Sequence, residues 1–172
     1  MRDDAAPVFT IIALLLALAL FLLPFIAFFV YVFYQNSRRK SLRARLMREM
    51  GQLASQYPSY PVRYASEERF KAFFKIFPWE GAGVILVAPG LLHFLGETFA
   101  GRRVELQLMP ANSRLNWLGK CPWPNGAVSW FEAVTAGGKH YFTSETGPFI
   151  FGSHAGTRAI YDGIVGGAIT QG

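Results

Sequence analysis

The sequence has few charged residues and almost no cysteine. Charged side chains make up 16% of the 172 residues, against roughly 25% in an average soluble protein, so part of the chain is unlike a soluble surface. A single cysteine, Cys121, excludes an intrachain disulfide and fits a reducing compartment. The histidines, His93, His140 and His154, are too widely spaced for a compact metal signature. We therefore predict no metal site and no bound cofactor.

Catalytic signatures are also missing. Paired carboxylates, a Walker loop and an HExxH motif are absent from the sequence. The glycines at 81 and 83 precede a strand pattern, whereas a dinucleotide-binding loop must follow a strand. Cys121, next to Lys120, could serve as a nucleophile only if the fold brought a histidine near it. We predict no catalytic residue, and an enzyme that uses Cys121 is the least favoured hypothesis.

Residues 8–34 lack charge altogether and predict a transmembrane helix. Their side chains are apolar except for Thr10 and two tyrosines, and about 20 apolar residues suffice to cross roughly 30 Å of hydrocarbon. The acidic start, MRDD, and the length of the segment argue against a cleaved signal peptide. We expect residues 1–7 to form a short extracytoplasmic tail and Pro24 to kink the helix. Without an ionisable side chain, this helix alone offers no proton relay and no haem ligand.

Positive charge gathers directly after this segment. The predicted membrane-interface residues, which are also candidate contacts to anionic lipid headgroups, are Tyr31, Tyr34, Arg38, Arg39, Lys40, Arg43, Arg45 and Arg48. Because basic flanks stay in the cytoplasm, we expect a single-pass protein of the cell (inner) membrane with its N-terminus outside and residues 35–172 in the cytoplasm. Residues 79–172 hold equal numbers of basic and acidic side chains. Nucleic acid is therefore not a predicted partner.

Residues 35–54 predict a basic juxtamembrane helix, because Leu42, Leu46, Met50 and Leu53 recur at helical spacing. This helix lies on lipid headgroups, packs on another subunit or forms a solvated stalk. Two prolines predict a linker over residues 55–65.

A short helix is then expected to begin after the N-cap residue Ser66. Helical spacing places Phe70, Phe73, Phe74 and Phe77 on one face. This aromatic face packs on the domain that follows or contacts a partner.

From Gly81 onward the pattern changes to that of strands. The predicted strands are residues 83–88, 91–95, 104–109, 115–118, 127–134 and 139–144, with turns between them. Ser153 is expected to cap a final helix that runs through Ile164, with Ala159, Ile160 and Ile164 on its inner face. We predict an α+β domain over residues 66–172, in which six or seven antiparallel strands form a barrel or sandwich closed by a C-terminal helix.

This order of elements resembles the pleckstrin-homology-like (PH-like) superfold, including GRAM-type and bacterial PH-like domains. The resemblance covers roughly residues 82–166. It rests on the hairpin GVILVAPGLLHFLGE, the hairpin AVSWFEAVTAGGKHYFTS and the helix SHAGTRAIYDGIV. Phosphoinositide-binding members carry basic residues in the first hairpin loop. The corresponding segment here, GETFAGRR, contains the acidic Glu97 as well as Arg102 and Arg103. We therefore do not infer phosphoinositide binding for this chain, because a shared fold alone does not establish a shared function.

Tryptophan offers the remaining candidate contact. Core packing explains Trp117 and Trp130 as well as surface contact does, whereas Trp123, between two prolines, is the better surface anchor. The favoured hypothesis is a non-catalytic accessory subunit that stabilises a larger membrane complex through other integral membrane subunits. Respiratory, photosynthetic and transport complexes are candidate hosts, with a photosynthetic reaction-centre–antenna assembly favoured on plausibility alone. The alternative is a membrane-tethered PH-like adaptor that binds lipid or peptide.

Overall fold

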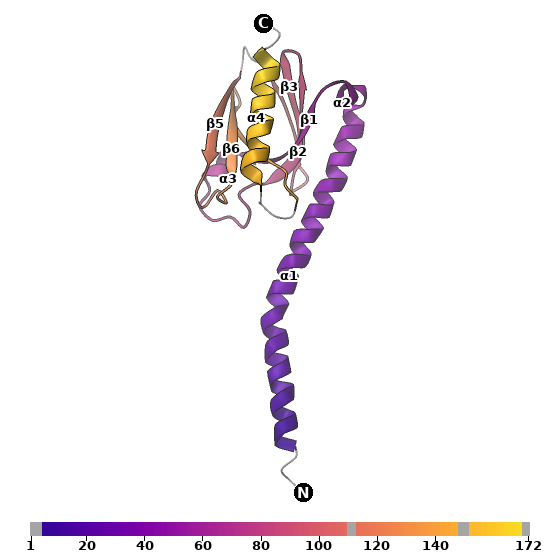
Figure 1. The fold of residues 1–172 in the computed structure, drawn as a ribbon, viewed down its shortest axis with the longest axis vertical. Helices are drawn as coiled ribbons and strands as arrows, with labels where there is room; N and C mark the ends of the chain where they lie inside the picture. Colours follow the sequence, from indigo (N-terminus) through magenta and orange to yellow (C-terminus); the bar gives the residue numbers. More distant parts are fainter. Residues whose placement is uncertain (1–4, 110–112, 148–151, 170–172) are drawn as a thin grey trace. The chain divides into compact units, whose positions relative to one another are not determined.

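The computed structural model describes residues 5–109, 113–147 and 152–169. The chain divides into two compact units, Met1–Arg38 and Arg39–Gly172, which we call the anchor unit and the sheet unit. The elements are α1 (Ala5–Met50), α2 (Gln52–Gln56), β1 (Ser59–Ser66), α3 (Glu67–Lys71), β2 (Gly81–Ala88), β3 (Leu91–Thr98), β4 (Arg103–Leu108), β5 (Arg114–Lys120), β6 (Ser129–Thr135), β7 (Gly138–Ser144) and α4 (Ser153–Ile169) (Figure 1).

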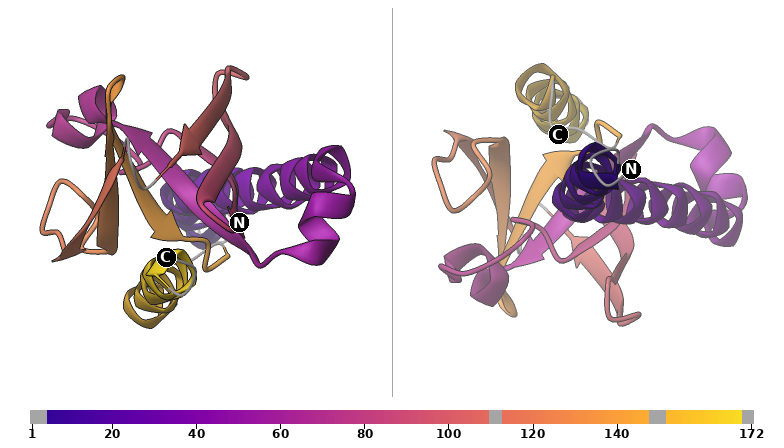
Figure 2. Two further views of the ribbon diagram at one scale, coloured as in Figure 1. Left: turned by 90° about the horizontal axis from the view of Figure 1, so that it is seen from above. Right: turned by 90° about the horizontal axis from the view of Figure 1, so that it is seen from below.

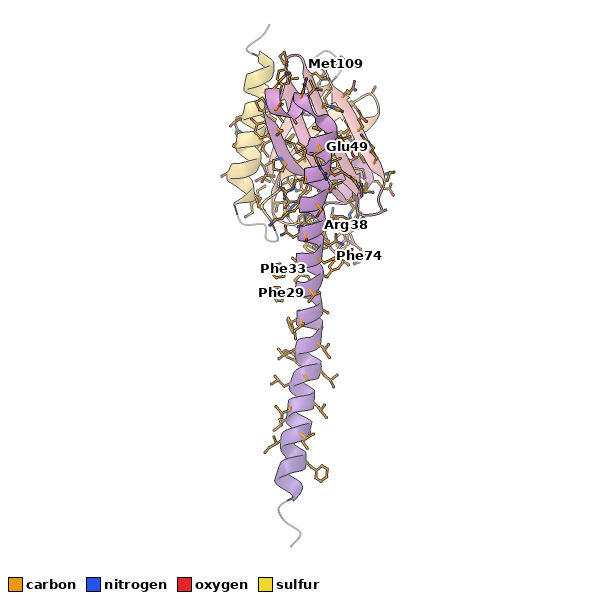
Figure 3. All side chains as sticks on the ribbon, turned by 90° about the vertical axis from the view of Figure 1, so that its right-hand side faces the viewer. Phe29, Phe33, Arg38, Glu49, Phe74 and Met109 are labelled. Atoms are coloured by element: carbon orange, nitrogen blue, oxygen red, sulfur yellow. The ribbon has the colours of Figure 1, made fainter. Side chains whose placement is uncertain are left out.

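The described part of the anchor unit is the apolar portion of α1. Among the described residues, α1 is the one helix long and apolar enough to cross a membrane, judged by length and composition. Between Phe9 and Tyr34 its apolar side chains are exposed except for Val32, and Figure 3 shows Phe29 and Phe33 projecting outward from the helix. Such a surface suits lipid better than water. Pro24 lies inside α1, and a kink at this residue stays a prediction.

The sheet unit is built on one antiparallel sheet of seven strands in the order β4-β3-β2-β1-β7-β6-β5. The sheet curls into a half-barrel, with α4 lying alongside it (Figure 2). β4 and β5 form the two ends of the strand order, and β5 carries a bulge between Trp117 and Gly119. The predicted fold class, antiparallel strands closed by a C-terminal helix, is confirmed.

One face of the sheet packs against α4, and we call it the α4 face. Ile160 and Ile164 of α4 join a buried aromatic and aliphatic cluster that includes Phe94, Phe131 and Phe142. Gly156 and Gly163 lie on the side of α4 that approaches the sheet, because a Cβ on Gly163 would stand 2.7 Å from the Tyr60 hydroxyl. The side chains at these positions therefore have to be small.

The opposite face is covered by the start of the sheet unit, and we call it the α1 face. Leu46 and Met50 of α1 pack on Val84, Leu86 and Leu95. The remainder of this face is covered by a second cluster, made of Ala65, Phe70, Phe77, Trp79, Phe99, Cys121, Val128, Trp130 and Tyr141. Because both faces are covered, β2 is buried along almost its whole length, which explains its uninterrupted apolar sequence.

The expected linker over residues 55–65 is wrong for most of its length, because Ser59–Ser66 form β1 in the middle of the sheet. Pro61 is tolerated in β1 by its position. Its carbonyl accepts a hydrogen bond from the Glu145 amide (3.1 Å), just beyond the last residue of β7. The Pro61 nitrogen faces the same side and lacks the N–H that would return a bond to Glu145, so the loss is limited to one bond at the end of the β1–β7 ladder.

Two expected helices also differ from the structure. α3 ends at Lys71, so the four phenylalanines do not share a helical face. Lys75 accounts for this end, because its ammonium group donates to the carbonyls of Arg69 (3.0 Å) and Phe70 (2.9 Å). The Ser66 N-cap is confirmed by a hydrogen bond from the Arg69 amide (3.3 Å).

α4 begins at Ser153 itself and extends beyond Ile164 to Ile169. Its buried face is made of Thr157, Ile160 and Ile164, whereas Ala159 is exposed. Thr157 takes the inward place because its hydroxyl accepts from the Ser144 amide (3.0 Å).

Candidate interaction sites

A buried ion cluster joins the first residue of the sheet unit to the sheet. Arg39 Nε lies 3.0 Å from Glu145 Oε2, and Arg63 Nη2 lies 2.9 Å from Glu145 Oε1. The three side chains are 6%, 1% and 1% exposed. The Arg63 guanidinium also stacks 4.0 Å above the Trp79 ring. Two cations share one carboxylate, so the cluster retains one uncompensated positive charge.

The predicted membrane-interface residues differ in burial and in their ion pairs. Arg39 is buried in the ion cluster, and Arg45 pairs with Glu97. Arg48 is exposed and donates to a carbonyl of its own helix (3.2 Å). Lys40 and Arg43 form no ion pair within the described residues. The remaining three, Tyr31, Tyr34 and Arg38, belong to the anchor unit, where both tyrosines are exposed.

Lys40 and Arg43 line a cavity of about 400 Å³ between α1 and the sheet, which we call the helix–sheet groove. Its other lining residues are Ala44, Met47, Ser59, Pro61 and Val84. Apart from Ser59, these walls are apolar. The groove therefore combines an apolar surface with two cations that pair with no carboxylate of the described residues, which suits an amphiphilic, negatively charged ligand or segment.

The predicted aromatic contact residues separate into two groups. Phe70 and Phe77 pack inside the sheet unit, where Phe70 stacks on the Tyr141 ring at 3.9 Å. Phe73 and Phe74 are 63% and 91% exposed.

Trp123 is 72% exposed, and Ile76, which the aromatic pattern did not include, is 82% exposed. The exposed residues lie on two loops, residues 72–77 and 121–125. Lys75 Nζ donates to Asn125 Oδ1 (2.5 Å) and holds the loops together. We call them the apolar loop pair.

A second cavity, of about 410 Å³, lies near the β3–β4 turn. It is lined by Arg69, Glu80, Thr98, Phe99, Ala100 and Arg102. Part of this polar lining is already engaged. Glu80 Oε1 accepts from the Ser66 amide (2.8 Å), and Arg69 Nη2 donates to the Phe77 carbonyl (2.8 Å).

The histidines have separate structural partners. The partner atoms are Glu105 Oε1 for His93 (3.0 Å), the Tyr64 hydroxyl for His140 (3.2 Å) and Ser129 Oγ for His154 (2.7 Å). Burial lowers the pKa of His140 and raises the pKa of Tyr64 to about 12, so at neutral pH the hydrogen bond joins a protonated phenol and a neutral imidazole. Among the described residues, no three His, Cys, Asp or Glu side chains are grouped as a metal site would require.

Cys121 packs against the second cluster of the α1 face. Burial raises the pKa of its thiol, which lowers the fraction of reactive thiolate. A nucleophile is activated by the opposite shift.

Comparison with known proteins gives no relative from which a site could be transferred. No family model matches the chain, and no curated protein and no solved structure shows significant similarity to it.

Sequence reasoning missed the ion cluster and the groove. Arg39 and Glu145 are more than 100 residues apart, and no local pattern pairs them. One signal was available, because Arg63 lies between Val62 and Tyr64 in a segment with strand alternation. A charged residue there implies either an exposed face or a buried partner.

Proposed function

We propose that this protein is a non-catalytic, single-pass accessory subunit that stabilises a larger membrane protein complex. The apolar helix anchors it, and the basic residues that follow favour the orientation with the N-terminus outside and the sheet unit in the cytoplasm. The ion cluster supports this role, because it fixes the residue at which the chain enters the sheet unit.

The helix–sheet groove carries the proposal. Lys40 and Arg43 follow residue 34, the last residue of the apolar segment, by six and nine residues, which is about 9 and 14 Å along a helix. The groove therefore opens within reach of the cytoplasmic side of a membrane partner. An acidic, apolar segment of an integral membrane subunit would neutralise both cations and cover the apolar walls. The class of host complex stays a prediction.

We also propose that the sheet unit belongs to the PH-like superfold. Seven antiparallel strands followed by one C-terminal helix are the features on which the resemblance rests. The second candidate function, a membrane-tethered adaptor that binds lipid, is favoured by the same groove, because an anionic lipid headgroup would also neutralise Lys40 and Arg43. The groove thus has two candidate occupants, which one experiment separates.

The full chain is purified in mild detergent, and its co-purifying proteins and lipids are identified by mass spectrometry. We expect a stoichiometric membrane protein partner with the wild-type chain. The variant Lys40→Glu/Arg43→Glu should lose most of it. The control Arg48→Glu/Arg158→Glu makes the same charge change at exposed positions outside the groove and should retain it.

Three other outcomes would contradict the proposal in whole or in part. Recovery of the wild-type chain without a protein partner would overturn the proposal. If anionic phospholipid alone co-purified, and the groove variant lost it, the adaptor would replace the subunit. Equal partner recovery with both double variants would remove the groove as the docking site.

A further inference from the structure

The apolar loop pair exposes a concentrated group of large apolar side chains. Phe73, Phe74, Ile76 and Trp123 are all more than 60% exposed. Lys75 holds the two loops in place, because its ammonium group donates hydrogen bonds to the last carbonyls of α3 and to Asn125 of the neighbouring loop. A fixed apolar projection of this kind is rare on a water-exposed surface and marks a contact with protein or membrane.

The chain segments that carry the loop pair are basic, and Glu67, two residues before the first of them, pairs with Lys71 (2.6 Å). Residues 69–79 and 113–131 contain basic side chains but no aspartate or glutamate. The basic residues in these stretches are Arg69, Lys71, Lys75, Lys120 and, at the far end of β5 from the second loop, Arg114. Apolar and aromatic side chains within a basic surround are the composition by which proteins bind the interface of an anionic bilayer. Tryptophan is particularly enriched at that depth.

The loop pair also lies close to the point where the chain enters the sheet unit. Arg39, the first residue of that unit, contacts Glu145, which contacts Arg63. The Arg63 guanidinium lies on the Trp79 ring, and that ring stacks on Phe77 with centroids 5.6 Å apart. Four consecutive contacts therefore connect Arg39 to the end of the first loop.

Arg39 in turn follows Tyr34, the end of the apolar segment, by five residues, or about 8 Å of helix. This separation is comparable to the thickness of the headgroup layer, which is about 5–8 Å on each side of the hydrocarbon. The residue at which the chain enters the sheet unit is thus tethered within about one headgroup layer of the end of the apolar segment. Figure 3 shows Phe74 at one end of the sheet unit and Met109 at the other.

We propose that the apolar loop pair inserts into the interface of the membrane that α1 spans, as a second contact with the bilayer. Phe73, Phe74, Ile76 and Trp123 enter the headgroup–acyl boundary, and the surrounding lysines and arginines contact anionic headgroups. The loop pair then fixes the sheet unit against the membrane surface, which one helix alone would leave free to rotate. This inference requires α1 to span the membrane and does not depend on what occupies the helix–sheet groove.

A spin label tests the insertion directly, because the chain has a single native cysteine. In a Cys121→Ser background, Phe74→Cys is labelled with a nitroxide and the full chain is reconstituted into vesicles of phosphatidylcholine and phosphatidylglycerol. Met109→Cys is the matched control, since Met109 is also exposed (46%) but lies at the opposite end. Neither substitution removes a buried side chain, so both variants should fold.

We expect the label at 74 to be accessible to oxygen and shielded from a water-soluble nickel chelate, with an accessibility ratio severalfold higher than at 109. Equal, water-like accessibility at both positions would overturn the proposal. Shielding of position 74 from both reagents would also overturn it, because that result indicates a protein contact. As a second measurement, brominated acyl chains should quench the wild-type fluorescence more than that of Trp123→Phe, and equal quenching would contradict insertion of Trp123.

Discussion

The α4 face and the α1 face of the same sheet are closed by different parts of the chain and with different chemistry. The α4 face is covered by the next element after β7, through close apolar contacts at Ile160 and Ile164. The α1 face is covered by residues that precede the strands or interrupt them, and a buried ion cluster lies among its apolar contacts. Packing on the α4 face therefore depends on the fit of apolar side chains, whereas packing on the α1 face depends on charge pairing as well.

The strongest test of this comparison is Glu145→Ala. The substitution leaves Arg39 and Arg63 buried without their shared carboxylate, and an uncompensated buried charge costs about 3–5 kcal/mol. The expected result is a loss of that size in the free energy of unfolding, measured by urea titration of the full chain in detergent. The control Asp162→Ala breaks an exposed ion pair with Arg158 and should cost less than about 1 kcal/mol. Similar losses in the two variants would show that the cluster is not buried.

A smaller effect is expected from the aliphatic part of the same face. Leu46 is 2% exposed, and Leu46→Ala should lower the free energy of unfolding by about 3 kcal/mol through the cavity it leaves. Leu53→Ala provides the control, because Leu53 is 50% exposed and should change stability by less than about 1 kcal/mol. If Leu46→Ala were neutral, α1 would not pack on β2 and β3 in solution.

The smallest effect concerns His140, which contacts Tyr64 of the α4-face core. Burial lowers its pKa in the folded state below the value of about 6.5 expected in the unfolded chain. The unfolded chain therefore binds more protons below pH 6.5, and stability falls as the pH drops through that value. Thermal melts at pH 7.5 and pH 5.5 should show a decrease for the wild type and a smaller decrease for His140→Gln. An equal decrease in both would assign the pH dependence to other groups.

Local patterns predicted β2 to β7 and α4, whereas β1 was missed and the covering of the α1 face could not be predicted. Alternation gave β4 correctly, with Val104, Leu106 and Leu108 on the inner side. The helical spacing of Leu42, Leu46 and Met50 was also correct, but periodicity identifies an apolar face without its partner. Three alternatives were open for that helix, and none was the chain's own sheet.

For the candidate sites, too, local patterns predicted some features, whereas others depend on contacts between distant residues. Trp123 was predicted to be exposed because its proline neighbours give a stiff loop, and it is. The phenylalanine series was misjudged because α3 stops at Lys71, and the cause is the capping of α3 by Lys75. That cap depends on a backbone turn, which residue spacing does not reveal. The pairing of Arg39 with Glu145 depends on the fold as a whole.

The open half-barrel has a consequence for chains that share a membrane. β4 and β5 end the strand order, so each has one edge that no strand of the sheet covers. Anchored proteins diffuse in a plane, which raises their effective concentration and the frequency with which such edges meet. β4 carries Arg103 and Glu105 at outward positions, and β5 has Arg114 and Lys120 at its ends and a bulge near its middle. Charged side chains on the edges and a broken hydrogen-bonding register oppose edge-to-edge pairing, so we expect that crowding in a bilayer would not join neighbouring copies into one continuous sheet.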